Sequence, residues 1–464
     1  MRGMDPRTPP DSAQPPGPPR RLWGLPVVRA MGRDFLGFAQ QRHRAHGDLS
    51  LMFIGSRACY DLFSPALVRE ALVDQAEHLV RLPRTIGVLQ RSFGLGHGVI
   101  TTEGATWQRQ RRMLQPAFTP RQVAGDAAQM RAAIETALER ALLAGADHAL
   151  VDMQALFGRV AMDVILRTLF SRAADAEADA AIGAMGVLGE AAMFDLIVPF
   201  NLPPWLPRRG KAARRQALQT LRDLVHGHIA RRRMQPDPAA GDDVLARLLA
   251  LRDDASGEAL SEQEVFDQCM VSFQAGHETT ATALTWWSRL LAQHPDAAAR
   301  ARAEVDAVLA GRDPGPEHLQ ALPFLTATLK EAMRLYPPLP ALITRHTLRE
   351  ISVGGWRIPP GASLYVTPWV LHRDPRWWSE PDEFRPGRFL PGAPEVPRGA
   401  WIPFGVGPRV CIGQHFAMLE MTLVAAMLLQ RFDVELPPDA PPMAAVLHVT
   451  LRPKGGVRLG LRHR

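Results

Sequence analysis

One cysteine of this chain lies in a loop that would stabilise a thiolate. An apolar helical pattern follows this loop, which reads Phe404-Gly405-Val406-Gly407-Pro408-Arg409-Val410-Cys411-Ile412-Gly413. At a helix N-terminus, unpaired N–H groups and the helix dipole favour negative charge, and glycines let further N–H groups approach the sulfur. With Arg409 two residues away, such surroundings lower the pKa of a thiol and suit it to bind a metal. The alternative is a buried structural cysteine beside a glycine turn.

A long helix is the best-defined element of the sequence. Ser261-Glu262-Gln263-Glu264 has the form of a capping box, and periodic apolar residues continue until His294-Pro295 stops them. About 34 residues at about 1.5 Å each make a rod of roughly 50 Å. Its middle, residues 275–280, reads Ala-Gly-His-Glu-Thr-Thr, although glycine costs about 1 kcal/mol relative to alanine in a helix. Such departures from helix preference are expected at functional sites, and the alternative is a kinked surface helix.

Two further motifs place charged residues at helical spacing. Glu331 and Arg334 lie three residues apart on one helix face and can form an ion pair, although a surface salt bridge would give the same pattern. Trp107 and Arg111 lie four residues apart, so both side chains leave one face of their helix. A guanidinium in such a place can bind a carboxylate of a ligand through two hydrogen bonds.

The remaining patterns predict a mainly α fold. Helical patterns dominate between about residues 100 and 335, whereas strand-like pieces occur near both ends, and no internal repeat or linker divides the chain. This mixture favours helices with small β-sheets over alternating strands and helices. The first twenty residues contain seven prolines, so we expect residues 1–20 to form a disordered or extended arm.

In combination, these segments resemble the cytochrome P450 family. The cysteine loop matches the family's haem-binding pattern Phe-x-x-Gly-x-Arg-x-Cys-x-Gly, and residues 275–280 match its oxygen-activation motif. The Glu331 motif, together with residues 384–389, is similar to the family's Glu-x-x-Arg and Pro-x-Arg-Phe pair, except that Gly387 replaces a commoner acidic residue. The resemblance implies the cytochrome P450 fold, with a single mainly α domain and small β-sheets over residues 21–464 around a buried haem b (iron protoporphyrin IX).

The resemblance assigns roles to residues of the long helix and the cysteine loop. Cys411 would be the axial ligand of the haem iron. Gly276 would leave room for dioxygen, the Thr279 hydroxyl would hydrogen-bond the dioxygen or an ordered water, and Glu278 would relay protons from solvent. Further contacts with the cofactor are implied for Ala275, Phe404 and Gly413.

Arginines would hold the two propionates of the haem. Trp107 and Arg111 would bind one propionate, and Arg345 and Arg409 would lie near the other. The alternative for Arg345 is an exposed arginine on a strand. The resemblance also implies a buried structural triad that locks the loop preceding the cysteine, formed by Glu331, Arg334 and Arg388.

The implied reaction inserts one oxygen atom of O₂ into an apolar organic substrate, by hydroxylation or epoxidation, with two electrons from NAD(P)H. About 50 residues follow Cys411, too few for a flavin or iron–sulfur domain, so we expect a separate ferredoxin or flavodoxin with its reductase. One alternative is a peroxygenase, or an isomerase or dehydratase that needs no electrons. The Glu278-Thr279 pair argues against these, since they have no dioxygen to protonate. Another alternative is a non-catalytic haem sensor or carrier, which generally comes with an output domain.

By resemblance, largely aliphatic and aromatic segments would line the substrate pocket, so we expect an apolar substrate that is not small. Terpenoid, polyketide and fatty acyl compounds all fit this expectation. The implied segments are the loop around Arg84 to Phe93, the region from Met193 to Trp205, Phe273 and Ala275, Pro340 to Ile343, and Ala445 to Leu447.

Composition limits the classes of binding partner and the cellular compartments that we expect for this chain. The net charge of +7 arises from 54 basic and 47 acidic residues, too small an excess to argue for nucleic acid but compatible with docking an acidic protein. Three cysteines are an odd and sparse set, which argues against disulfides and for a reducing compartment. No apolar run approaches the ~18 residues of a membrane span, and the N-terminus lacks the apolar core of a signal peptide. We therefore expect a cytoplasmic monomer without a membrane span.

Overall fold

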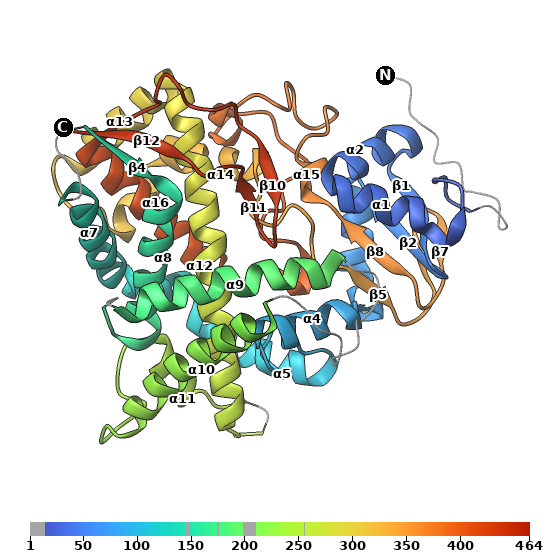
Figure 1. Cartoon of the computed structure of the whole chain (residues 1–464), viewed down its shortest axis with the longest axis horizontal. Coiled ribbons are helices and arrows are strands. Elements are labelled where there is room, and N and C mark those ends of the chain that lie inside the picture. The colour runs from blue at the N-terminus through green and yellow to red at the C-terminus, as the bar shows by residue number, and fades with distance from the viewer. Residues whose placement is uncertain (1–13, 144–147, 174–175, 198–209, 255) are drawn as a thin grey trace.

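The structure is a computed structural model that describes residues 14–143, 148–173, 176–197, 210–254 and 256–464. Helices make up most of it, as the mainly α prediction requires (Figure 1). The α-helices are α1 (Leu25–Arg33), α2 (Phe35–His46), α3 (Pro65–Arg69), α4 (Pro83–Phe93), α5 (Gly104–Leu114), α6 (Pro120–Gly125), α7 (Ala127–Leu143), α8 (Met153–Phe170), α9 (Ala176–Ile197), α10 (Lys211–Arg233), α11 (Val244–Ala250), α12 (Glu262–Gln293), α13 (Pro295–Leu309), α14 (Pro323–Leu335), α15 (Pro368–Leu371) and α16 (Gln414–Arg431).

The strands form small separate sheets, which confirms the predicted mixture. The largest sheet has the order β1-β2-β8-β5-β3, in which only β2 and β8 run parallel. A three-stranded antiparallel sheet has the order β4-β12-β9, and two hairpins pair β6 with β7 and β10 with β11. The strands are β1 (Leu49–Ile54), β2 (Arg57–Leu62), β3 (Leu79–Arg81), β4 (His148–Asp152), β5 (Arg345–Thr347), β6 (Ile351–Val353), β7 (Trp356–Ile358), β8 (Ser363–Val366), β9 (Phe432–Glu435), β10 (Ala445–Leu447), β11 (Leu451–Pro453) and β12 (Arg458–His463).

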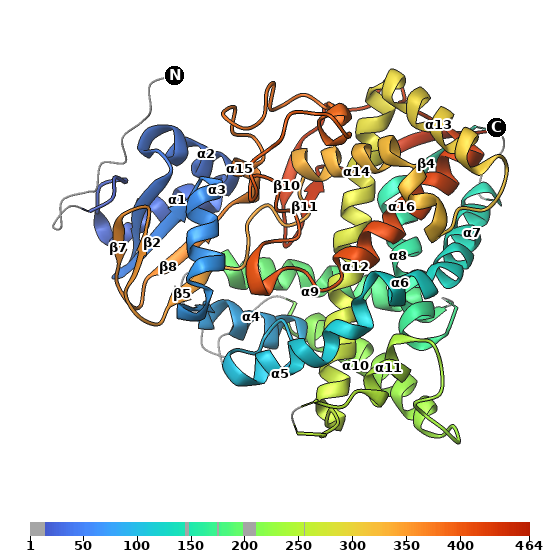
Figure 2. The same cartoon turned by 180° about the vertical axis from the view of Figure 1, so that it is seen from behind.

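Helix α12 runs through the helical part of the molecule, with α8, α14 and α16 packed against it (Figures 1 and 2). It begins with the predicted capping box, in which the Ser261 hydroxyl accepts from the Glu264 N–H at 3.2 Å and the Glu264 carboxylate accepts from the Ser261 N–H at 2.9 Å. Trp286 and Trp287 are fully buried, and the Trp287 indole N–H donates to the Thr328 hydroxyl of α14 at 2.9 Å. The alternative of a kinked surface helix is therefore wrong, because this helix is the centre of the core.

Part of the proline-rich arm packs on the large sheet. Residues 14–20 form neither helix nor strand, but the Pro16 carbonyl accepts a hydrogen bond from the Leu51 N–H of β1 at 2.9 Å. The Arg20 guanidinium lies 4.6 Å from the centre of the Phe53 ring on the same strand. β1 is an edge strand, whose free N–H groups need partners, and an extended proline-rich chain offers carbonyls to them. Residues 14–20 thus contact the sheet, as the extended form of the expected arm can, and residues 1–13 lie outside the described part.

Candidate active site

The loop that carries Cys411 directly precedes α16, and its backbone requires glycine. Gly407 has a φ angle of +75°, in the left-handed region that glycine adopts without strain, and a Cβ atom there would overlap the Leu72 carbonyl oxygen. The Cys411 N–H donates to the Phe404 carbonyl at 2.9 Å, which closes the loop. Gly413 is the N-cap of α16, so the cysteine lies two residues before the N-cap of the helix that the sequence predicts.

Cys411 is reached by solvent and yet has many protein atoms around its sulfur. The residue is exposed, yet burial raises the pKa of its thiol above the ordinary value, and the Gly413 N–H and the Arg111 guanidinium oppose that rise. Both observations hold if the sulfur faces a space that solvent enters but protein surrounds. The predicted lowering of this thiol's pKa is therefore wrong for the polypeptide by itself, because desolvation outweighs the helix terminus and the nearby cation.

Protein ligands for a metal do not gather around this cysteine. Among the residues that the structure describes, no three His, Cys, Asp or Glu side chains come together as a metal site. A single thiolate holds a metal only if the other ligands come from another molecule. A haem would meet this need, since its ring would supply other ligands of the iron and Cys411 could supply a thiolate.

The polar patch of α12 presents Ala275, Glu278 and Thr279 to a cavity. Ala275 is exposed although most of its neighbours on α12 are buried, and it lines the cavity together with Thr279. The Thr279 hydroxyl donates to the Ala275 carbonyl at 2.8 Å. Gly276 meets α8 instead, where an added Cβ atom would lie 2.6 Å from Cδ1 of Ile165. Helix packing is therefore one reason for glycine at this position, and its role in leaving room for dioxygen stays a prediction.

Glu278 is held by the hairpin of β10 and β11. Arg452 donates to Oε1 of Glu278 from Nη2 at 2.7 Å and from Nε at 3.1 Å, and the Thr450 hydroxyl donates to the same oxygen. One face of α12 anchors the hairpin further along, where the Trp286 indole N–H donates to the Leu451 carbonyl at 2.6 Å. Glu278 also lines the cavity, so its carboxylate lies between the cavity and β11. No local pattern in the sequence predicted Thr450 or Arg452 as its partners.

His277 faces away from this cavity. Its Nε2 lies 3.0 Å from the Gly158 carbonyl oxygen of α8. Burial lowers the pKa of His277 to about 4, so the imidazole is neutral near pH 7. This histidine therefore packs α12 against α8 and is not a candidate for proton transfer.

The cavity has a volume of about 960 Å³ and extends from α12 to α1 near the N-terminus. Its mainly apolar lining includes residues of the predicted segments 84–93, 340–343 and 445–447, together with Met193. Two details differ from the prediction, because residues 84–93 belong to helix α4 and Phe273 is fully buried in the core. The α1 side of the lining was not predicted, and residues 198–205 lie outside the described part.

Four arginines with little compensating charge come together near α5 and the cysteine loop. Burial lowers the pKa of Arg81 to about 9, and the charges of the other three act in the same direction. Burial likewise lowers the pKa of Arg409 to about 10, while Glu103 opposes both shifts. The four residues are Arg81, Arg111, Arg345 and Arg409.

Within the described ranges, the contacts of these arginines include a single carboxylate partner, Glu103. Arg409 pairs with Glu103, donates to the Thr102 carbonyl at 3.0 Å and lies 3.7 Å from the centre of the Trp107 ring. Arg81 donates to a backbone carbonyl at 2.8 Å. One carboxylate against four partly or fully buried guanidinium groups is unfavourable unless an anion binds among them. A ligand with two carboxylates, such as a haem, fits this cluster.

The predicted propionate contacts of these arginines stay predictions, but the structure decides whether Arg345 is exposed. Arg345 is 9% exposed, so the alternative of an exposed strand arginine is wrong. Trp107 stacks on Arg409, and its binding of one propionate together with Arg111 stays a prediction. Arg81 was not predicted at all, although one charged residue in the apolar run 79–82 was a signal for it.

The predicted triad exists and is completely buried at its centre. Glu331 and Arg334 are both 0% exposed, and two parallel hydrogen bonds of 2.7 and 2.8 Å join them. Nε of Arg388 donates to the same carboxylate at 3.1 Å. The remaining N–H groups of Arg334 donate to three backbone carbonyls between residues 372 and 383. The alternative of a surface salt bridge is therefore wrong.

His372 connects this triad to the cysteine loop. Its Nδ1 lies 3.2 Å from the Arg334 carbonyl oxygen, and its Nε2 accepts from the Ile402 N–H at 2.9 Å. Burial lowers the pKa of His372 to about 3, with the charge of Arg334 acting in the same direction, so the ring is neutral. Ile402 lies two residues before Phe404, the first residue of the cysteine loop. Arg334 of the triad is therefore connected to the start of this loop through His372. No motif in the sequence marked His372.

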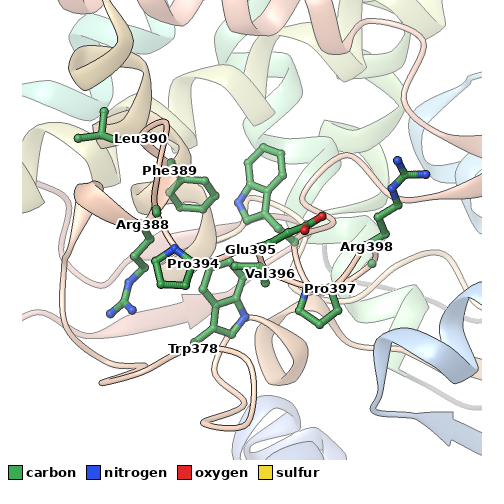
Figure 3. A pocket seen from close by; sticks show the side chains of 12 residues that line it. Trp378, Arg388, Phe389, Leu390, Pro394, Glu395, Val396, Pro397 and Arg398 are labelled. Carbon is green, nitrogen blue, oxygen red and sulfur yellow. The ribbon is translucent and has the colours of Figure 1, made fainter.

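A second cavity, of about 340 Å³, lies beside the triad (Figure 3). Arg388 and Arg398 stand on opposite sides of it, with Phe389, Pro394 and Trp378 between them. It shares no lining residue with the cavity beside α12. We assign it no part in the chemistry.

Comparison with known proteins agrees with the site. The family model described as "Cytochrome P450" matches residues 15–459 of the chain. The chain belongs to the cytochrome P450 family.

Three relatives of this cytochrome P450 come from Streptomyces. "Cyclooctatin synthase" of Streptomyces melanosporofaciens is 38% identical over 84% of this chain and 83% of that protein. "Cyclooctat-9-en-7-ol 5-monooxygenase" of the same species is 33% identical over 93% of this chain and 94% of that protein. "Pentalenene oxygenase" of Streptomyces avermitilis is 33% identical over 90% of each chain.

Membership establishes the cofactor and the reaction class of this cytochrome P450. It binds haem b and is a monooxygenase that incorporates oxygen from O₂ into an apolar organic substrate, with electrons from redox partners. The arginine cluster and the solvent-accessible Cys411 fit such a cofactor. None of the helices in the described ranges combines the length and apolar character needed to cross a bilayer.

Proposed function

We propose that this cytochrome P450 oxygenates a terpenoid in the cavity beside α12, with Cys411 as the axial ligand of the haem iron. The observation that carries the proposal is a mainly apolar space of about 960 Å³ whose α12 wall includes Glu278 and Thr279. The names of two relatives specify pentalenene and cyclooctat-9-en-7-ol as the compounds oxygenated. These names favour a terpenoid over the polyketide and fatty acyl alternatives.

The four clustered arginines are assigned to the haem propionates. When bound, the haem supplies the iron that binds O₂ and receives electrons. Arg345 and Arg81 are buried, and Arg409 is braced by Trp107, so their guanidinium groups are held in place before the cofactor arrives. Ala275, Phe404 and Gly413 are assigned to further contacts with the cofactor.

Replacing Arg111 or Arg409 by alanine is expected to speed haem loss roughly 10- to 100-fold. Each substitution removes a charge-assisted hydrogen bond to a propionate, which is worth roughly 1.5–3 kcal/mol. The measurement is transfer of haem to an excess of a haem scavenger. Arg112→Ala is the matched control, since Arg112 lies on α5 as well but pairs with Asp253 at 2.7 Å. If both variants lose haem at the rate of this control, the arginines do not bind the cofactor.

Glu278 and Thr279 are assigned to proton delivery. Glu278 is half-buried, lines the cavity and is held through one carboxylate oxygen by Arg452, so its second oxygen is available to receive a proton from solvent. The Thr279 hydroxyl donates its own proton to the Ala275 carbonyl, which leaves its oxygen free to accept from a water or to orient one. Together they provide an acid–base group and a positioned hydroxyl at the cavity wall.

Thr279→Ala is expected to retain haem, substrate and O₂ binding but to release peroxide instead of product. Protons no longer arrive in the required order, so NAD(P)H consumption continues without oxygenation. Glu278→Gln should slow turnover by about 10²-fold, the low end for losing one acid–base group. The measurement is product formed per NAD(P)H consumed, with an active substrate and a working redox chain.

Thr285→Ala is the matched control for that experiment. Its hydroxyl donates to the carbonyl four residues earlier, as in Thr279, but at 2.6 Å in the buried core. When hydrogen peroxide replaces O₂ and NAD(P)H, Thr279→Ala and Glu278→Gln should lose much less activity, since peroxide brings its own protons and electrons. If Thr279→Ala forms as much product per NAD(P)H consumed as the wild type, the result would favour the peroxygenase or isomerase alternative.

We propose that the electrons come from a separate ferredoxin or flavodoxin with its reductase. The net charge of +7 supports docking of an acidic protein. We also propose a monomer in the cytoplasm; the compartment is supported by the three free cysteines, Cys59, Cys269 and Cys411.

A further inference from the structure

Large apolar side chains are exposed together where α1 begins, at one edge of the molecule (Figure 1). Leu22, Trp23 and Leu25 are 73%, 77% and 64% exposed, and neighbouring apolar side chains of this size are rarely left in water without a function. The packing of α1 does not depend on them, because Val27 and Met31 pack this helix against residues of β1 and β2. We call residues 22–25 the apolar turn.

The backbone of the apolar turn is strained. Leu22 and Trp23 have φ angles of +44° and +55°, in the left-handed region that residues other than glycine rarely adopt. The Gly24 N–H donates to the Arg21 carbonyl at 2.9 Å. The Gly55 N–H, directly after β1, donates to the Trp23 carbonyl at the same distance. Hydrogen bonds thus hold the strained turn beside the sheet, and strain of this kind is concentrated at functional sites.

Positive charge accompanies the apolar turn. Residues 14–36 contain four arginines and one acidic residue, Asp34, whose carboxylate accepts from the Gly37 N–H at 2.9 Å at the start of α2. Arg57 adds a fifth guanidinium, two residues after the glycine that contacts Trp23. All five arginines are exposed, namely Arg20, Arg21, Arg29, Arg33 and Arg57. Exposed apolar and aromatic side chains among arginines are typical of segments that bind the surface of an anionic bilayer.

The substrate cavity extends to the same surface. Trp23, Arg33 and Arg57 are exposed, and all three line the cavity of about 960 Å³. Val28 and Met31 of α1 also line it and are only partly exposed. The end of the cavity beside α1 therefore lies at the apolar turn and its arginines.

We propose that the apolar turn and these arginines bind the surface of an anionic lipid membrane. Trp23 and the two leucines enter the boundary between headgroups and acyl chains, while the arginines contact the phosphates. This inference goes beyond the proposed function, because it states where the protein meets an apolar substrate. A membrane fits this surface better than an acidic protein does, because an apolar compound dissolved in the bilayer would lie directly at the cavity.

The test measures binding of the haem-loaded full chain to lipid vesicles by co-sedimentation. One set of vesicles contains equal parts of phosphatidylglycerol and phosphatidylcholine, and the other contains phosphatidylcholine alone. We expect the anionic vesicles to be bound at least about tenfold more tightly, since each arginine near such a surface contributes about fivefold. Trp23→Ser should weaken this binding about tenfold, because a large apolar side chain no longer leaves water.

Two charge variants test the arginines separately. Arg21→Gln and Arg29→Gln should each weaken binding to the anionic vesicles about fivefold and leave binding to phosphatidylcholine unchanged. Both residues are exposed and neither lines the cavity. If Trp23→Ser loads haem poorly, these two variants decide.

Met234→Ser is the matched control and should bind as the wild type does, since Met234 is 85% exposed but lies directly after α10, away from α1 (Figure 1). Absence of vesicle binding by the wild type overturns the proposal, as does equal binding to the two sets of vesicles. Wild-type binding by Trp23→Ser, or an equal loss in Met234→Ser, also overturns it. A wild-type dimer that dissociates in Trp23→Ser without vesicle binding, measured by analytical ultracentrifugation, would assign the surface to a second copy instead. None of these outcomes affects the proposed oxygenation, because no substrate takes part in the test.

Discussion

Cys411→Ser is expected to abolish monooxygenase activity and the red-shifted carbonyl absorption that is typical of thiolate-ligated ferrous haem. A serine hydroxyl does not ionise near neutral pH and cannot replace a thiolate as the electron-donating axial ligand. The loop itself should survive the change, because its closing hydrogen bond runs from the backbone N–H of residue 411 to the Phe404 carbonyl. The measurement is the absorption spectrum of the reduced, carbonyl-bound protein.

The other two cysteines are the controls for this prediction. Cys59 and Cys269 are both fully buried, and burial raises the pKa of Cys59 to about 12. Their thiols therefore stay protonated within the core. Cys59→Ser and Cys269→Ser should keep the red-shifted band. A Cys411→Ser protein that retains the band would contradict the assignment of Cys411 as ligand.

Glu331→Ala is expected to leave almost no soluble haem-loaded protein. The substitution leaves Arg334 charged, fully buried and without its carboxylate, and it removes the acceptor for the Arg388 Nε and the Arg385 N–H. Breaking one partner of such a buried pair costs about 3–5 kcal/mol, a large part of the stability of a typical domain. The measurements are the yield of haem-loaded protein and its melting temperature.

Glu435→Ala is the control for the triad, since Glu435 pairs with Arg462 at 3.0 Å on the protein surface. An exposed pair contributes about 0–1 kcal/mol, so this variant should melt close to the wild type. Normal yield and melting temperature of Glu331→Ala would contradict the structural role of the triad. Arg334 would then have to be satisfied by the backbone carbonyls of the segment from residue 372 to 383.

Patterns within one element predicted their local structure well. The capping box at Ser261, the helix after the cysteine loop and the pairing of Glu331 with Arg334 all depend on residues a few positions apart. Hydrogen bonds and side-chain reach over such spacings are properties of the helix itself. The resemblance extended these patterns to the fold and the cofactor, and the family match over residues 15–459 confirmed both.

The electrostatic balance of the site was not evident from the sequence. The loop composition predicted a lowered pKa for Cys411, but burial raises it. Arg81 joins the arginine cluster only because β3 pairs with β5, which carries Arg345. Desolvation and the sum of nearby charges depend on everything that surrounds a group, so neighbouring sequence positions are a poor guide to them.

The sequence by itself determined the chemistry that this protein carries: one cysteine in a glycine loop, an acid and an alcohol in the middle of a long helix, and a glutamate spaced to meet an arginine. Tertiary structure alone decided which residues form hydrogen bonds with these groups. Arg452 reaches Glu278 across 174 residues, and Gln274 caps a helix 181 residues earlier in the chain. His372 links Arg334 to the cysteine loop through backbone atoms that no side-chain pattern marks. The physical reason is range, since helix spacing orders side chains over one or two turns, whereas contacts between distant segments follow from how the whole core packs.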